Sequence, residues 1–285
     1  MAENNIRVVM LPWSAFGHLI PFFKLSTALA KAGVRVSFIS SPKNIQRLPK
    51  LPSTLSHLVE LVQLSLPSLD KELLPEGAEA TVDIPFEQIH WMKDIAHEFQ
   101  VKLLFFNVFS ASTITFFGAP TRKILFPPEW VRFPSSVAFR RHEPIAFCAN
   151  ANQVNASGIS DLERLAEVLT YSEIVLFRSC YEIKGEYLTA FQKLVGKHVI
   201  LVGMIELSLL PVERPERGGN QDSVPYGFHG RTSNRGIVCM GWIPQKKLRI
   251  NTREAAAIVG NLKLHQDHYI AAFVQFLKDG IWKLT

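Results

Sequence analysis

His18 is the residue whose type and position most clearly predict chemistry. It follows Gly17 in a short loop, soon after the apolar run Ile6 to Leu11. An imidazole titrates near neutral pH and accepts a proton at hydrogen-bond distance, so a histidine held there can act as a general base. In open α/β sheets, ligands bind at the carboxyl ends of the strands. We therefore predict that His18 lies at a functional site; the alternative is a structural histidine.

The elements that must position His18 form a βαβ unit. Ile6 to Leu11 has the β-branched, apolar pattern of a buried parallel strand. A helix is predicted to open with Pro21 in its first turn, where the missing N–H of proline costs nothing, and to stop at Gly33. A second strand, Val34 to Ser40, follows at once. His18 is thus expected where the first strand meets its helix.

Strands and helices go on alternating over residues 1–205, which predicts a doubly wound, Rossmann-like α/β domain. Ser160 and Glu163 have the spacing of a capping box for a helix that starts at Asp161, and Gly196 is expected to stop the next helix. The further strands are expected at Val59–Leu66, Val101–Phe109, Ile174–Phe177 and Val199–Val202.

The character of the sequence changes after this domain. Residues 206–235 are rich in proline and glycine and are expected to form a linker or long loop. Residues 236–285 begin with one short apolar run and are otherwise helical, with a break near 260–265. The last helix is expected to bury an apolar face made of Ile270, Phe273, Val274 and Leu277.

Composition narrows the class of protein. The chain has 285 residues, of which 47% are hydrophobic and 20% charged, as in an ordinary globular protein. Its 31 Lys and Arg against 25 Asp and Glu give a net charge of +6, and the densest basic cluster, Lys246 to Arg249, has no interleaved aromatic residues. We therefore expect no nucleic-acid partner. The N-terminal apolar run fits neither a signal peptide nor a membrane span, so no stable membrane insertion is expected.

Cysteine and histidine spacings do not predict a metal site. Three widely separated cysteines favour a reducing compartment, and a cytoplasmic location is expected. Cys180 is expected to be a small buried hydrophobic residue. His265 and His268 flank Asp267, which leaves a zinc site as a minor alternative to a helix cap at Asp267. Asp94, His97 and Glu98 are interpreted as a solvated helix surface rather than an acid/base cluster.

Three segments together resemble the plant UDP-sugar-dependent glycosyltransferases. They are Pro12 to Pro21 with its Gly17-His18 pair, Phe177 to Glu182, and Arg231 to Gln245, which ends in Trp242-Ile243-Pro244-Gln245. The branch that adds rhamnose or glucose to flavonoid or triterpenoid glycosides is the most similar. The resemblance implies a GT-B-like fold, in which an N-terminal acceptor-binding domain faces a C-terminal domain that binds the UDP-sugar.

The resemblance also implies roles for individual residues. His18 would be the general base of an inverting transfer, and Gly17 and His18 would contact a small apolar acceptor. Trp242 would stack on uracil, and Ile243 and Gln245 would contact the rest of the uridine. The UDP-sugar would be a co-substrate, with no cofactor or metal. A catalytically inactive, shortened relative that at most binds small apolar ligands is the alternative function.

The sequence departs from the family pattern in three places, and we interpret the chain as internally truncated. The family has an aspartate four residues ahead of a His-Trp pair, whereas here Phe86 to Ile89 precede His90-Trp91, with Glu87 as a poor substitute. The strand and glycine-serine loop expected between Arg217 and Gly227 are missing. Gln245 is followed at once by Lys246, without the family's phosphate-binding loop. Residues 236–285 are therefore expected to be a remnant of the sugar-donor domain.

Overall fold

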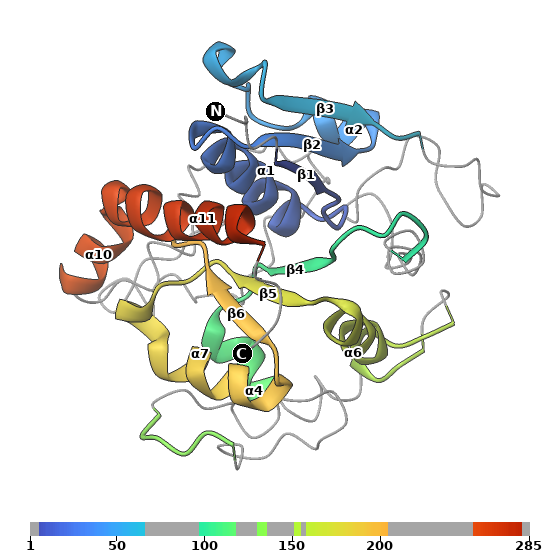
Figure 1. The fold of residues 1–285 in the computed structure, drawn as a ribbon. Helices are drawn as coiled ribbons and strands as arrows, with labels where there is room; N and C mark the ends of the chain where they lie inside the picture. Colours follow the sequence, from blue (N-terminus) through green and yellow to red (C-terminus); the bar gives the residue numbers. More distant parts are fainter. Residues whose placement is uncertain are drawn as a thin grey trace, which may run out of the picture. The chain divides into compact units, whose positions relative to one another are not determined.

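A computed structural model describes residues 6–65, 97–117, 130–135, 151–154, 158–204 and 253–280 (Figure 1). In these ranges the strands are β1 Arg7–Met10, β2 Arg35–Ser40, β3 Val59–Gln63, β4 Leu104–Asn107, β5 Ile174–Phe177 and β6 His198–Leu201. The longer helices are α1 Phe16–Lys31, α4 Ala111–Phe117, α6 Asp161–Tyr171, α7 Tyr181–Val195, α10 Arg253–Gly260 and α11 Ala271–Asp279. The short elements are α2 Pro42–Gln46, the 3₁₀ turn η1 Ser53–Leu55 and the π-helical segment η2 Leu264–Ile270.

Two three-stranded parallel sheets organise the described chain. The first has the order β1-β2-β3, with Arg7 opposite Arg35 and Val36 opposite Val59. The second has the order β4-β5-β6, with Leu104 opposite Ile174. Every strand pairing in these two sheets is parallel, and helices lie between the successive strands of each sheet, as connections between parallel strands require. The predicted Rossmann-like α/β class is confirmed.

One hydrophobic core joins both sheets to helices from the two ends of the chain. Phe22 and Phe23 of α1 meet Phe106 of β4 and Phe38 of β2, with ring centroids 4.9 and 6.0 Å apart. The same core contains Phe273 and its neighbours on α11. Burial of these apolar side chains is the main force that orders the unit.

The contacts divide the chain into two compact units. Met1–Leu207 and Ile258–Thr285 form the first, and Ser208–Ala257 form the second. The predicted apolar face of the last helix is confirmed, because Ile270, Phe273 and Val274 are buried and Leu277 packs against the same core. The domain boundaries at 205 and 235 stay a prediction. The apolar run expected after residue 236 lies outside the described residues.

Candidate functional site

The structure corrects the predicted start of the first helix. α1 begins at Phe16, so Pro21 lies inside it and not in its first turn. The carbonyl of Ala15 accepts hydrogen bonds of 2.8 Å from the N–H groups of His18 and Leu19. Phe16 packs against the hydrophobic core, and this burial stabilises the additional helical turn. Proline is compatible with this longer helix because its fixed φ is close to the helical value. His18 therefore lies in the first turn of α1, just past the carboxyl end of β1.

His18 is half-buried and electrically neutral at pH 7. Its ring meets the edge of Phe109, with the centroids 5.8 Å apart and the planes at 82°. Burial lowers the pKa of His18 from 6.5 to about 4, because the charged form loses its hydration. The Nδ1 atom is buried and has no hydrogen-bond partner within the part of the chain that the structure describes. The imidazole can thus accept a proton, but no described residue fixes which nitrogen carries the hydrogen.

The depressed pKa makes the stability of the fold depend on pH. Between pH 6.5 and 4 the unfolded chain protonates His18 while the folded chain does not, so acidification favours unfolding in this window. We expect the free energy of unfolding to fall by up to about 3 kcal/mol from this group. Urea unfolding from pH 7.5 to 4 measures it.

The His18→Gln variant should lose that part of the acid dependence, because glutamine does not titrate. The matched control is His57→Gln, whose side chain is exposed in the wild type and should leave the slope unchanged. An equal slope in wild type and His18→Gln would contradict the buried, neutral state.

Phe109 is held firmly at the carboxyl end of β4. The buried Asn107 side chain accepts a hydrogen bond from the Phe109 N–H at 3.2 Å and donates one to its carbonyl at 3.3 Å. Ser110 then accepts from the Thr113 N–H at 3.2 Å, at the start of α4. Phe109 as a whole residue is 47% exposed, beside His18. Such a ring can pack against the apolar body of a ligand.

The sequence alone does not identify Phe109 as a candidate site residue. The sequence feature that could point to Phe109 is its position at the end of an apolar strand, directly before a run of small, mostly polar residues that starts a helix. That signal marks the carboxyl edge of the sheet, where ligands bind. It does not reveal that Phe109 lies against His18, which is far away in the sequence.

Two aromatic residues that precede His18 in the sequence, Trp13 and Phe16, each contact an arginine side chain. The Arg164 guanidinium of α6 lies 5.4 Å from the ring centroid of Trp13, and the Arg47 guanidinium lies 5.8 Å from that of Phe16. Arg164 also forms a 3.2 Å ion pair with Asp161 in its own helix. These contacts fix the loop between β1 and α1 and thereby the start of the helix that carries His18.

Gly17 leaves open space beside His18. Apart from its chain neighbours Phe16 and His18 and the nearby backbone of its own helix, no heavy atom would lie within 4 Å of a Cβ atom placed on this exposed residue. Since alanine favours a helix more than glycine does, we expect Gly17→Ala to keep the fold and to raise the free energy of unfolding by up to ~1 kcal/mol.

Gly203→Ala is the matched comparison for this experiment. At Gly203 φ is +75° and a Cβ atom would lie 3.0 Å from the His265 side chain, so this variant should lose ~1 kcal/mol or more. Thermal unfolding of both variants tests the pair. A Gly17→Ala variant as unstable as Gly203→Ala would contradict the open space at Gly17.

The remaining predicted residues fall into two groups. Trp242, Ile243 and Gln245 lie outside the described residues, as do Glu87 and His90-Trp91, so their roles stay predictions. Cys180 is fully buried as predicted, and burial raises the pKa of its thiol to about 12. A thiol of that kind is unreactive.

His265 has a structural role. Its Nδ1 accepts a hydrogen bond from the Met204 N–H at 3.2 Å, and its Nε2 lies 2.9 Å from the Ile258 carbonyl. Asp267 lies within η2, whose N-cap is Lys263, so the predicted helix cap at Asp267 is wrong. In the described ranges no group of three or more His, Cys, Asp or Glu side chains could hold a metal ion.

Comparison with known proteins decides the family. UDP-glycosyltransferase 91A1 of Arabidopsis thaliana is 29% identical over 356 aligned positions, which include 90% of this chain and 75% of that protein. Soyasaponin III rhamnosyltransferase of Glycine max is 28% identical, over 99% of this chain and 67% of that protein. The chain belongs to the plant UDP-glycosyltransferase family. This membership agrees with the GT-B-like fold class expected from the sequence.

The solved glycosyltransferase structures that are similar to this chain are longer than it is. No family model matches the chain. The crystal structure of Arabidopsis thaliana UGT89C1 complexed with UDP-L-rhamnose is similar with a TM-score of 0.47 and 18% identity, over 77% of this chain and 56% of that one. The chain spans about half the length of the solved structures that it matches.

UDP-glycosyltransferase 91A1 contains residues, within the aligned region, that have no counterpart in this chain. The alignment with UDP-glycosyltransferase 91A1 has 356 positions, whereas the chain has 285 residues. At least 71 positions of that alignment therefore have no counterpart here, in agreement with the predicted internal truncation. Among the described helices, none is both long enough and apolar enough to cross a membrane.

Proposed function

We propose that the chain transfers a sugar from a UDP-sugar to a hydroxyl group of a small plant metabolite, a flavonoid or terpenoid glycoside, with inversion at the anomeric carbon. Family membership supports the reaction type, and the rhamnosyltransferase relative supports a glycosylated terpenoid as acceptor. The observation that carries the proposal is His18, a neutral imidazole at the carboxyl end of β1 beside Phe109. The reaction takes place in the cytoplasm and uses no cofactor.

The reaction that we propose requires one proton transfer and one displacement. The imidazole of His18 accepts the proton of the acceptor hydroxyl while the oxygen attacks the anomeric carbon. The bond from that carbon to the diphosphate breaks on the opposite face, and UDP leaves with the electron pair. Phe109 packs against the apolar body of the acceptor, while Gly17 leaves room for it. Trp242 stacks on uracil, and Ile243 and Gln245 contact the uridine.

A specific observation favours a second candidate, an inactive relative that binds acceptor-like molecules only. A general base needs a group that holds its tautomer and stabilises its protonated form. The buried Nδ1 of His18 has no such partner among the described residues, and its pKa of about 4 makes it a weak base. In that case the same surface, with His18 and Phe109, would bind small apolar molecules without chemistry.

Two measurements on the full chain separate the candidates. The first is UDP release from UDP-glucose and from UDP-rhamnose in the presence of a quercetin glycoside, with the product identified by mass. The second is calorimetric binding of UDP and of the quercetin glycoside, each alone. Turnover that depends on the acceptor and exceeds that of His18→Ala supports the transferase. Binding of the quercetin glycoside without UDP affinity or turnover supports the inactive relative and excludes the transferase.

A further inference from the structure

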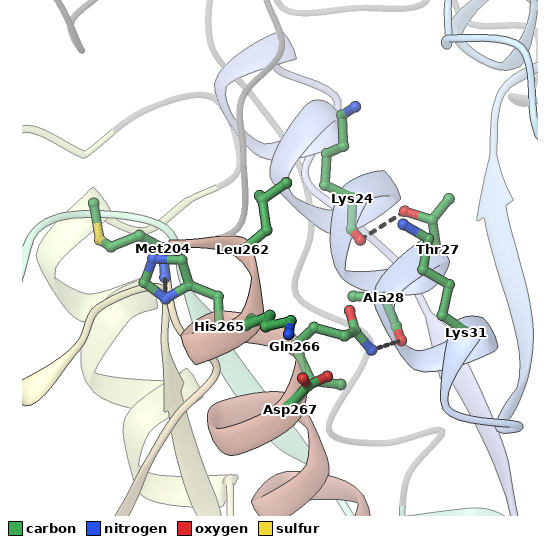
Figure 2. Close-up of a pocket in the computed structure, with 11 residues that line it drawn as sticks. Lys24, Thr27, Ala28, Lys31, Met204, Leu262, His265, Gln266 and Asp267 are labelled. Carbon is green, nitrogen blue, oxygen red and sulfur yellow. Dashed lines mark hydrogen bonds between the residues drawn. The ribbon is translucent and has the colours of Figure 1, made fainter. Parts of the chain in front are cut away.

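A cavity lies along α1, and His18 is not among the residues that line it. It has a volume of about 380 Å³ and is open to solvent between the C-terminal half of α1 and the segment around η2 (Figure 2). That size is at the lower end of the range for pockets that hold small organic ligands. The residues that line it are Lys24, Thr27, Ala28, Lys31, Met204, Leu262, Lys263, His265, Gln266, Asp267 and Ile270.

The walls of this cavity, which we call the α1–η2 pocket, are held together by hydrogen bonds. The Gln266 side chain donates from Nε2 to the Ala28 carbonyl at 3.1 Å, which joins the two walls directly (Figure 2). His265 is 4% exposed and is bonded through both ring nitrogens to backbone groups of Met204 and Ile258. The pocket therefore exists before any ligand binds, which lowers the entropic cost of binding.

Positive charge dominates the polar lining of the α1–η2 pocket. Lys24 and Lys31 are seven residues apart on α1 and so project from one face of it, and Lys263 comes from the opposite wall. Asp267 is the one acidic residue among the described residues that line the pocket. Lys31 and Lys263 have neither an ion-pair partner nor a hydrogen-bond partner within the described ranges.

The other groups that line the pocket are apolar or are already hydrogen-bonded within the protein. Leu262, which is 58% exposed, contributes most of the hydrocarbon surface, and Ala28 contributes a little. The Ala28 carbonyl, which would repel an anion, already accepts the hydrogen bond of Gln266. We propose that the α1–η2 pocket binds a small organic anion, whose phosphate or carboxylate pairs with Lys31 and Lys263 while its apolar body rests on Leu262 and Ala28.

Lys31, one of the two lysines of the proposed anion site, lies far along α1 from His18. His18 is in the first turn of α1, whereas Lys31 is its last residue, so the two are separated by about 20 Å along the helix axis. A ligand there touches both α1 and η2, and it should stabilise the packing of the C-terminal segment on the first unit. Binding and thermal stability measure this effect without reference to activity.

Phenyl phosphate is the probe, with phenol and inorganic phosphate as its two halves. We expect calorimetry on the full chain to give saturable binding of phenyl phosphate, at least tenfold tighter than binding of either half, and to give a rise in melting temperature. Lys31→Met and Lys263→Met keep the aliphatic stem and remove the charge, so each should weaken binding about fivefold. The pair together should weaken it about twentyfold or more.

Lys278→Met is the matched control, because Lys278 is an exposed lysine of the neighbouring α11 that does not line the pocket. It should bind phenyl phosphate as the wild type does. The folding of the variants is checked by their melting temperatures without ligand. The proposal is overturned if no saturable binding occurs below ~10 mM, if phenol or inorganic phosphate binds as tightly as phenyl phosphate, or if Lys31→Met, Lys263→Met and Lys278→Met bind it equally.

Discussion

Replacing His18 with alanine is expected to lower the rate of sugar transfer by about 10²- to 10⁴-fold, the usual contribution of a positioned general base. The fold should survive, because the ring is only half-buried and its contact with Phe109 is a single edge-to-face pair. The measurement is kcat/KM for UDP release with a saturating UDP-sugar and a varied acceptor. His57→Ala, at an exposed histidine of the same unit, should retain the wild-type rate.

The pH dependence of the same reaction gives a sharper test of the base. A base must be unprotonated to act, and burial lowers the pKa of His18 to about 4. We therefore expect kcat/KM to stay level from pH 8 to pH 5 and to fall below pH 5. A fall centred near pH 6.5 would mean that a partner stabilises the imidazolium, and a profile shared with His18→Ala would remove His18 from the mechanism.

Local signals in the sequence predict the fold wherever the neighbouring residues decide the conformation. The capping box is present as predicted, with the Ser160 N–H bonded to the Glu163 carboxylate at 2.7 Å and the Glu163 N–H bonded to the Ser160 hydroxyl at 3.2 Å. Gly196 ends α7 with a φ of +64°, a conformation that favours glycine. The strand at Ile174–Phe177 has the predicted bounds.

Features that depend on contacts between residues far apart in the sequence cannot be predicted from local sequence patterns. The sequence predicts too late a start for α1, because Pro21 is compatible both with a first turn and with an early helix interior. Only the packing of Phe16 on the core selects the longer helix. The contact between His18 and Phe109 joins two separate βα units. His265 likewise accepts a hydrogen bond from the Met204 N–H, 61 residues away, and no local sequence pattern predicts this contact.

Replacing Phe273 with alanine is expected to cost about 3–5 kcal/mol of the free energy of unfolding, the range for a large aromatic residue removed from a core. Phe273 of α11 is 2% exposed and belongs to the same core as Met10 of β1, Phe38 of β2 and Phe106 of β4. Its loss would leave a cavity where the C-terminal helix meets both sheets. Urea unfolding, followed by tryptophan fluorescence and circular dichroism, measures the change.

The matched control is Phe99→Ala, because Phe99 is 67% exposed and its removal should change the stability by less than ~0.5 kcal/mol. The sequence assigns Phe273 to a remnant of the sugar-donor domain, whereas the contacts include it in the first unit. If Phe273→Ala costs no more than Phe99→Ala, the C-terminal helix does not contribute to that core. A single cooperative transition with the full loss would mean that Ile258–Thr285 unfolds together with the rest of the first unit, so that the two ends of the chain stabilise one another.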